Sequence, residues 1–126
     1  MNLYELTAHE LSDKLKAKEV SSTEITKSVI ERIEKVEGTI GSYITSTHEQ
    51  ALETAKLVDN KIANGEEIAP LEGIPMAIKD NICTEGIKTT CASKMLENFL
   101  NTIVQKFSQQ LRLQSHHVLI HPFHHK

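Results

Sequence analysis

Three capping-box sequences occur in the first 50 residues, and they constrain the fold more than any other feature. A capping box places Ser or Thr before a helix and Glu or Gln three residues later, so that each side chain binds the other residue's backbone N–H. The three pairs are Thr7 with Glu10, Ser21 with Glu24, and Thr47 with Gln50. The pattern predicts three helix starts, so we expect the N-terminal half of the chain to be helical.

Apolar residues follow each box at helical spacing, which is typical of amphipathic helices. They are Leu11 and Leu15 in the first; Ile25, Val29, Ile33 and Val36 in the second; and Ala51, Ala55, Val58 and Ile62 in the third. We expect Gly38 to end the second helix and Asn64-Gly65 to end the third. Between these two helices, Tyr43 to Thr45 is a candidate for a short extended segment.

The sequence changes character at residue 66. Two prolines and a glycine between Ala69 and Pro75 indicate a loop. Met76 to Ile78 is a short apolar run that suits a buried strand, although periodicity alone does not separate it from a helix. Lys79, Asp80 and Asn81 follow at once, then a polar loop from Thr84 to Ser93. Lys94 to Phe99 is expected to begin another helix.

Charge is divided unevenly along the 126 residues. The 14 Lys and Arg residues against 17 Asp and Glu give a net charge of −3, yet residues 100–126 contain no acid. That segment also holds five of the seven His. We therefore divide the chain into residues 1–99 and a divergent Gln/His-rich tail, residues 100–126. We expect the tail to come from a change of reading frame or a truncated gene, or to be disordered.

Composition excludes several classes of protein. No apolar run approaches the roughly 18 residues of a transmembrane helix, and the first residues lack the basic and apolar regions of a secretory signal. With only Cys83 and Cys91, a disulfide scaffold is excluded and a reducing compartment is expected. The acidic body is a poor nucleic-acid binder by charge alone. We expect a cytoplasmic protein that does not enter a membrane.

Lys79 is the candidate functional residue. A lysine at the end of a buried strand can lose its hydration, which lowers its pKa toward the range of a general base. The alternative is a surface lysine paired with Asp80, and spacing alone favours it because structural ion pairs are commoner than catalytic lysines.

The His-rich tail and the two cysteines are weaker candidates for a metal site. His117, His121 and His125 are spaced to share one face of a helix, but Pro122 disfavours a helix there. We favour a His-rich end without a dedicated site, with adventitious binding of divalent ions as the alternative. The two cysteines match no metal spacing and are expected to be structural or free thiols. We expect no metal or cofactor in this chain.

The residues around Lys79 resemble the amidase signature family. Gly73 to Ile82 reads GIPMAIKDNI, and Thr89 to Ser93 reads TTCAS. Within that family, residues 1–99 most resemble the A subunits of the bacterial glutamyl-tRNA(Gln)/aspartyl-tRNA(Asn) amidotransferases, including SYIT from Ser42 and LEGIP from Leu71. The resemblance covers about four-fifths of the chain.

This resemblance implies an α/β fold, with N-terminal helices and the beginning of an amidase-type mixed sheet that is incomplete here. It implies a Ser–cis-Ser–Lys triad in which Lys79 is the lysine. The reaction implied is glutamine hydrolysis, which supplies ammonia for converting Glu-tRNA(Gln) to Gln-tRNA(Gln). A partner subunit uses the ATP and magnesium. The implied partners are subunits B and C, glutamine and, through the complex, tRNA.

The two serines of that triad are missing from this sequence. In the family they belong to a Gly/Ser-rich segment downstream of the lysine, and no such segment occurs here. Ser93 lies in the matched loop without the Gly-Ser-Ser context, and Ser108 and Ser115 lie in the tail. We expect this chain to be inactive alone.

Two other functions stay open. One is a non-catalytic helical module that docks partner subunits or self-associates. The other is the N-terminal part of a different amidase of the same family, one that hydrolyses fatty, aryl or small aliphatic amides.

Overall fold

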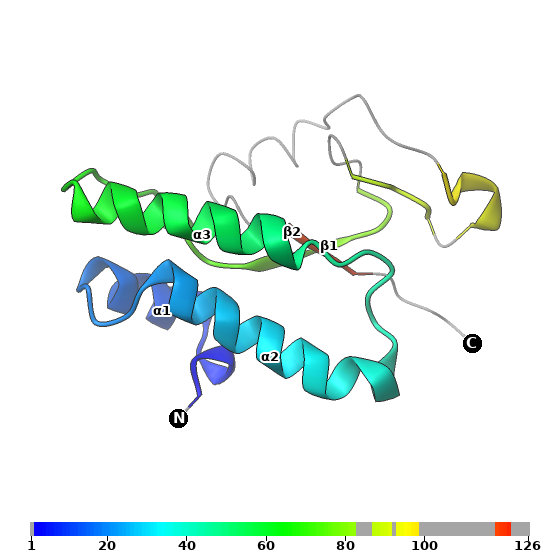
Figure 1. The fold of residues 1–126 in the computed structure, drawn as a ribbon, viewed down its shortest axis with the longest axis horizontal. Helices are drawn as coiled ribbons and strands as arrows, with labels where there is room; N and C mark the ends of the chain where they lie inside the picture. The colour runs from blue at the N-terminus through cyan, green and yellow to red at the C-terminus, as the bar shows by residue number, and fades with distance from the viewer. Residues whose placement is uncertain (1, 83–86, 92, 99–117, 122–126) are drawn as a thin grey trace.

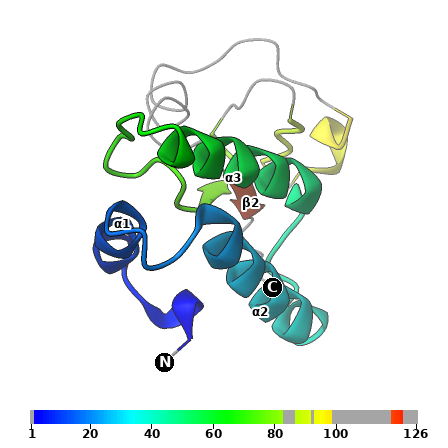
Figure 2. The ribbon, with the colours of Figure 1, turned by 60° about the vertical axis from the view of Figure 1, so that its left-hand side comes forward.

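The computed structural model describes residues 2–82, 87–91, 93–98 and 118–121, and it shows a helical layer beside a two-stranded sheet. Helices α2 and α3 lie antiparallel, and the strands lie next to α3 (Figures 1 and 2). The elements in order are η1 (Leu3–Glu5), α1 (Ala8–Lys16), α2 (Ser22–Ile40), α3 (His48–Ala63), β1 (Met76–Lys79), η2 (Lys94–Leu96) and β2 (Val118–His121).

Two of the three predicted capping boxes are confirmed. The Thr7 N–H donates to Glu10 Oε2 at 2.8 Å, and the Glu10 N–H donates back to Thr7 Oγ1 at 3.3 Å. Ser21 and Glu24 make the same pair of hydrogen bonds at 2.8 and 3.1 Å. Both boxes satisfy N–H groups that have no partner within the helix itself.

The third box is wrong, although its helix begins where expected. Helix α3 starts at His48, but the Thr47 side chain makes no capping hydrogen bond. The physical reason is the backbone of Thr47, with φ −118° and ψ 41°. Thr7 and Ser21 instead have the extended backbone that directs an N-cap side chain at its helix.

The expected stop at Gly38 is also wrong. Helix α2 continues to Ile40 and ends at Gly41, which takes the left-handed conformation with φ +62°. Glycine adopts that conformation without the steric cost of a Cβ. Helix α3 ends before Asn64-Gly65, as the sequence predicts. The extended candidate from Tyr43 to Thr45 is reduced to an isolated bridge residue, Thr45.

The helix expected from Lys94 is a single 3₁₀ turn, η2. Ser93 precedes that turn, and its side chain makes no capping hydrogen bond. Without a cap, only one turn forms within Lys94–Leu96. Phe99, the last residue of the expected helix, lies outside the described residues.

The apolar stripes predicted from the sequence form most of the core. Leu11, Leu15, Ile25 and Ile74 make one buried cluster between α1, α2 and the loop before β1. Ala51, Ala55 and Val58 of α3 are buried too, together with Ile30 and Ile33 of α2. Each fully buried Leu, Ile or Val side chain stabilises the fold by about 1.5–3 kcal/mol.

The loop before β1 is hydrogen-bonded to the first two helices. Ser12 Oγ donates to the Pro70 carbonyl at 2.6 Å, and the buried Ser22 Oγ donates to the Gly73 carbonyl at 2.7 Å. Gly73 has φ +88°, and a Cβ there would lie 2.8 Å from Leu15 Cδ2. The loop therefore fits against the helices only with glycine at this position, and it sets where β1 begins.

Helix α3 holds the same loop through an ion pair. Lys61 Nζ lies 2.8 Å from Glu72 Oε1, and the Ala69 N–H donates to Glu72 Oε2 at 3.0 Å. The hydrogen bond from Lys61 to the Glu72 carboxylate raises the pKa of Lys61. The loop is thus bound by side chains of all three helices.

The predicted strand is confirmed as β1, and it pairs in parallel with β2. Lys79 is in register with His121, the last residue of β2. A sheet of two strands is all that forms among the described residues, in agreement with an incomplete α/β fold. The sequence did not predict β2, which lies in the Gln/His-rich tail. The origin of that tail stays a prediction.

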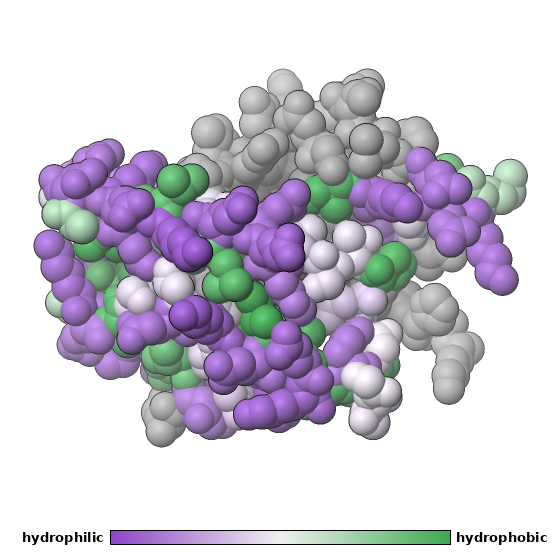
Figure 3. All heavy atoms as spheres, viewed as in Figure 1, coloured by the Kyte–Doolittle hydropathy of each residue, from purple (hydrophilic) through white to green (hydrophobic). Residues whose placement is uncertain are grey.

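The face shown in Figure 3 is mainly polar over the described residues, with apolar side chains between the polar ones. Among the described residues, the most exposed large apolar side chains are those of Met95, Ile40 and Leu57, with relative exposures of 95%, 62% and 62%. Within the described part of the chain, no helix is long and apolar enough to cross a membrane.

Candidate functional site

Lys79 is the last residue of β1, at the strand end that the sequence predicts. The preceding residue, Ile78, is only 3% exposed and fixes the strand against the interior. Lys79 itself is exposed. The surface position, which spacing alone favoured, is the one found here, because the described residues leave the side chain in contact with solvent.

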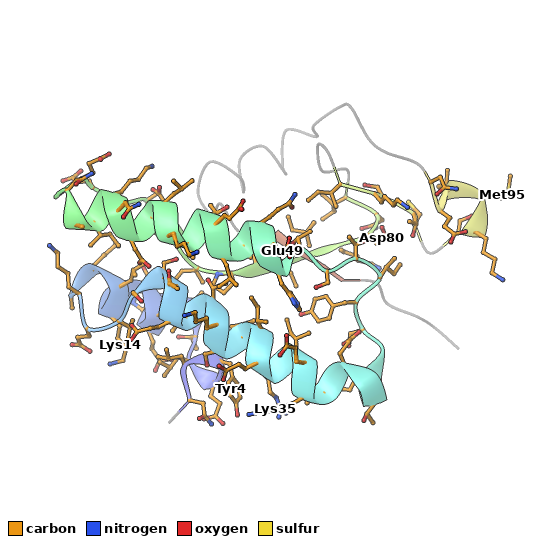
Figure 4. All side chains as sticks on the ribbon, viewed as in Figure 1. Tyr4, Lys14, Lys35, Glu49, Asp80 and Met95 are labelled. Atoms are coloured by element: carbon orange, nitrogen blue, oxygen red, sulfur yellow. The ribbon has the colours of Figure 1, made fainter. Side chains whose placement is uncertain are left out.

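A tight turn follows Lys79. The Ile82 N–H donates to the Lys79 carbonyl at 2.9 Å, which closes the turn from residue 79 to 82. Asp80, the second residue of this turn, is buried (Figure 4). A buried carboxylate is costly unless hydrogen bonds replace its hydration.

Thr90 supplies two of those hydrogen bonds. The Thr90 N–H donates to Asp80 Oδ1 at 2.7 Å, and Thr90 Oγ1 donates to Asp80 Oδ2 at 2.5 Å. The Cys91 N–H adds a third bond, to the Asp80 carbonyl, at 3.2 Å. Through these three bonds Asp80 ties the turn after β1 to residues 90–91.

These bonds bring together the two sequence stretches that carry the family resemblance. Thr89 and Thr90 of the TTCAS stretch are buried beside the turn that follows GIPMAIK. Sequence spacing offered Lys79 as the partner of Asp80 and missed Thr90. No periodicity links residues ten positions apart across a loop, so only the TTCAS resemblance pointed to this segment.

Cys91 has an unusual backbone in this segment. Its φ is +48°, a left-handed value that non-glycine residues seldom adopt. Its thiol is free and exposed, as the sequence predicts. Cys83 lies outside the described residues.

The other sequence candidates are not brought to Lys79 by any described contact. Ser93 is part-buried, and its N–H donates to the Thr90 carbonyl at 2.8 Å. Ser108, Ser115, His117 and His125 lie outside the described residues, and only the backbone of His121 is described, in β2. In the described part of the chain, no group of three or more His, Cys, Asp or Glu residues is arranged to hold a metal ion.

Two surface hollows lie on the helical part rather than at Lys79. One, of about 340 Å³, is lined by residues of the α1–α2 connection and of α3, including Leu15, Val20 and Ile62. The other, of about 390 Å³, is lined by residues 46–50 at the start of α3.

The chemical group that the end of β1 offers is the amine of Lys79, on an exposed side chain. Such an amine is suited to exchanging protons with groups supplied from elsewhere.

A family model described as Amidase matches residues 24–120 of this sequence. The chain belongs to the amidase family. The matched range includes Lys79, Asp80 and Thr90, and it runs past Phe99 into the segment that composition set apart. The boundary at residues 99 and 100 therefore remains a prediction from composition.

Curated relatives of this amidase chain are about four times as long as the chain itself. The A subunit of the glutamyl-tRNA(Gln) amidotransferase of Moorella thermoacetica is 57% identical over 100 residues, which cover 79% of this chain and 20% of the relative. The protein of the same name from Heliobacterium modesticaldum is 54% identical over 113 residues, 86% of this chain and 23% of the relative.

A solved structure shows the same fold. A bacterial aryl acylamidase of the amidase signature family superposes with a TM-score of 0.85 over 92% of this chain and 25% of its own. At 21% sequence identity, this likeness speaks for the fold alone. The predicted α/β class is thereby confirmed, with the described elements forming part of a larger amidase fold.

Proposed function

We propose that this chain is the front part of the glutamine amidase subunit of a tRNA-dependent amidotransferase, with Lys79 as the lysine of its catalytic triad. The observation that carries this is the 57% identity over 100 residues to the A subunit of a glutamyl-tRNA(Gln) amidotransferase. The solved amidases acting on other amides include a fatty acid amide hydrolase that is only 21% identical. Glutamine is therefore favoured over fatty or aryl amides.

In the proposed reaction, Lys79 is the proton acceptor of a three-residue relay. It takes a proton from a serine on a cis peptide bond, and that serine activates the nucleophilic serine that attacks the glutamine amide. Neither serine is supplied by this chain, so the chain alone is inactive. Subunits B and C complete the complex, a partner subunit uses ATP and magnesium, and tRNA binds through the complex.

A chimera tests this proposal. Residues 1–98 of this chain replace the matched segment of the Moorella thermoacetica relative, which is produced with the other subunits of its complex. We expect the chimera to release glutamate from glutamine and the chain alone to release none. Lys79→Ala in the chimera lowers kcat by about 10³-fold or more, as removal of a triad member does.

Lys56→Ala is the matched control, because Lys56 is an exposed lysine on α3. It is expected to leave kcat within about twofold of the unsubstituted chimera, like most surface changes. Full activity of the Lys79→Ala chimera contradicts the proposed role of Lys79. Glutamine hydrolysis by the chain alone contradicts the expectation that the chain is inactive without the rest of the enzyme.

A second function, a non-catalytic module that self-associates, is favoured by a separate observation. Leu57 on α3 and Met95 in η2 are largely exposed, and both β1 and β2 are sheet-edge strands within the described residues. Exposed apolar side chains and strand edges favour association. Size-exclusion chromatography with light scattering tests it, and a monomer at every concentration contradicts it.

A further inference from the structure

The structure contains two aspartates with nearly identical bonding in different places. Asp80 accepts from the Thr90 N–H and the Thr90 hydroxyl. Asp59, on α3, accepts from the N–H groups of Ser22 and Thr23 at 2.7 and 3.1 Å, and from the Thr23 hydroxyl at 2.6 Å. Asp59 thus joins two helices, whereas Asp80 holds the turn that begins at Lys79.

We propose that Asp80 is the positioning residue of Lys79, acting through its hydrogen bonds to Thr90 and Cys91. This inference rests on the proposed catalytic role of Lys79. Asp80 does not itself take part in the proton relay. It fixes the position of the Lys79 backbone, and therefore the point from which the Lys79 amine reaches the serine relay.

The geometry supports this role in three ways. The turn from Lys79 contains the bond from the Ile82 N–H to the Lys79 carbonyl, and Lys79 and Asn81 are surface-exposed. Asp80 is the buried member of the turn and is bonded through both carboxylate oxygens and its carbonyl. Because Lys79 has a long flexible side chain, its reach depends on a fixed backbone.

Small displacements at such a position have large effects on rate. A misplacement of about 1 Å costs on the order of 10²-fold when reacting groups must stay aligned. Removal of the Asp80 carboxylate removes both bonds to Thr90 and leaves the bond from the Cys91 N–H to the Asp80 carbonyl, so we expect the turn to shift by about this distance. The effect falls on kcat rather than on KM, because Asp80 is buried and is not proposed to contact glutamine.

The experiment compares Asp80→Ala with Asp59→Ala in the chimera described above. We expect Asp80→Ala to lower kcat by about 10²-fold with KM within about threefold. Asp59→Ala loses a comparable set of hydrogen bonds, so it lowers the melting temperature. Its kcat per folded enzyme stays within about twofold, because its bonds lie between α2 and α3.

A double substitution separates positioning from general weakening. If Asp80 acts through Lys79, Lys79→Ala with Asp80→Ala is no slower than Lys79→Ala alone. The inference is overturned if Asp80→Ala lowers only the melting temperature, as Asp59→Ala does. It is also overturned if the two substitutions lower kcat multiplicatively in the double variant.

Thr90→Val covers the case in which Asp80→Ala fails to fold. It removes the hydroxyl donor and keeps the Thr90 N–H bond to Asp80. We expect kcat to fall by about 3- to 10-fold with KM unchanged, as for the loss of one hydrogen bond. A folded Thr90→Val chimera with unchanged kcat overturns the inference. If Lys79→Ala is itself fully active, the proposed function fails instead.

Discussion

The helical part, residues 2–75, and the strand-end part, residues 76–98, are held together by different kinds of contact. Helices α1 and α2 begin with bonds between residues three positions apart. The bonds that shape the turn after Lys79 join residues ten positions apart across a loop. The starts of α1 and α2 are therefore specified locally, whereas the packing of the helices and the candidate site both depend on how separate segments meet.

The two parts also differ in how complete they are. The helical part buries a core of its own, from Leu11 and Leu15 to Ile25. The strand-end part places an exposed lysine at the edge of a sheet that has only two strands in the described chain. Since the relatives are about four times as long as this chain, the helical part is the portion expected to keep its structure alone.

The largest effect is expected at Gly73, where the two parts join. In Gly73→Ala the new Cβ meets Leu15 Cδ2 at 2.8 Å and Val58 Cγ1 at 3.0 Å, at a φ of +88°. Overpacking and left-handed strain together lower the free energy of unfolding by about 3 kcal/mol or more. Urea unfolding of the chain measures this.

Gly65→Ala is the control for Gly73→Ala. Gly65 has a φ of +78°, but nothing lies within 4 Å of its Cβ position. Only the left-handed strain remains, about 1–2 kcal/mol. Equal losses in the two variants contradict the tight fit of the loop against the helices.

A smaller effect, an increase in the free energy of unfolding, is expected for a substitution inside the helical part. Thr26 is fully buried on α2, and its hydroxyl has no hydrogen-bond partner within the structure described. Thr26→Val keeps the shape of the side chain and removes the unpaired hydroxyl, so the free energy of unfolding rises by about 1 kcal/mol. Thermal or urea unfolding measures this.

Thr54→Val is the counterpart on α3, because its hydroxyl donates to the Gln50 carbonyl at 2.8 Å on an exposed face. Thr54→Val is expected to change the free energy of unfolding by no more than about 0.5 kcal/mol. Destabilisation by Thr26→Val means that the Thr26 hydroxyl is satisfied in solution, and the interface between α2 and α3 is then more polar than described.

The smallest effect is the pH dependence of the two capping boxes. Backbone hydrogen bonds from Thr7 and Ser21, followed by their side-chain hydrogen bonds, lower the pKa of Glu10 and Glu24 below the ordinary 4.5. A lowered folded pKa gives stability above pH 4.5 that is lost as the pH falls through the folded value.

Glu10→Gln with Glu24→Gln tests this dependence, because glutamine keeps a capping oxygen and loses the charge. The acid limb of the unfolding midpoint against pH becomes shallower, and the midpoint at neutral pH falls slightly, because the stability that the ionised carboxylates contribute there is lost. Glu31→Gln with Glu53→Gln removes the same charge from positions inside α2 and α3. An equally shallow limb in that control contradicts the role of the caps.

Sequence reasoning succeeded where the deciding contact is local. Thr7 and Ser21 each bind a glutamate three positions later, so their boxes were readable. It failed at Gly38, because two glycines lie three positions apart and only Gly41 takes the left-handed conformation that ends the helix. It also failed at Thr47, because the residue types match a capping box and the sequence does not show the backbone angles that Thr47 adopts.

The candidate site was only partly readable. The strand before Lys79 followed from a short apolar run between turn signals, and the motif identified the lysine. The bond from Asp80 to Thr90 spans a loop, and the pairing of β1 with β2 joins segments far apart in the sequence. Such contacts have no periodic signature.

The pairing of β1 with β2 has a consequence for synthesis on the ribosome. Residues 80–117 separate the two strands, so β1 waits for about 40 further residues to be made. At roughly 5–20 residues per second, that delay is about 2–8 s, whereas helices form in microseconds. Each nascent chain therefore passes through a period in which its helices can form while β2, the partner strand of β1 in this structure, has not yet been made.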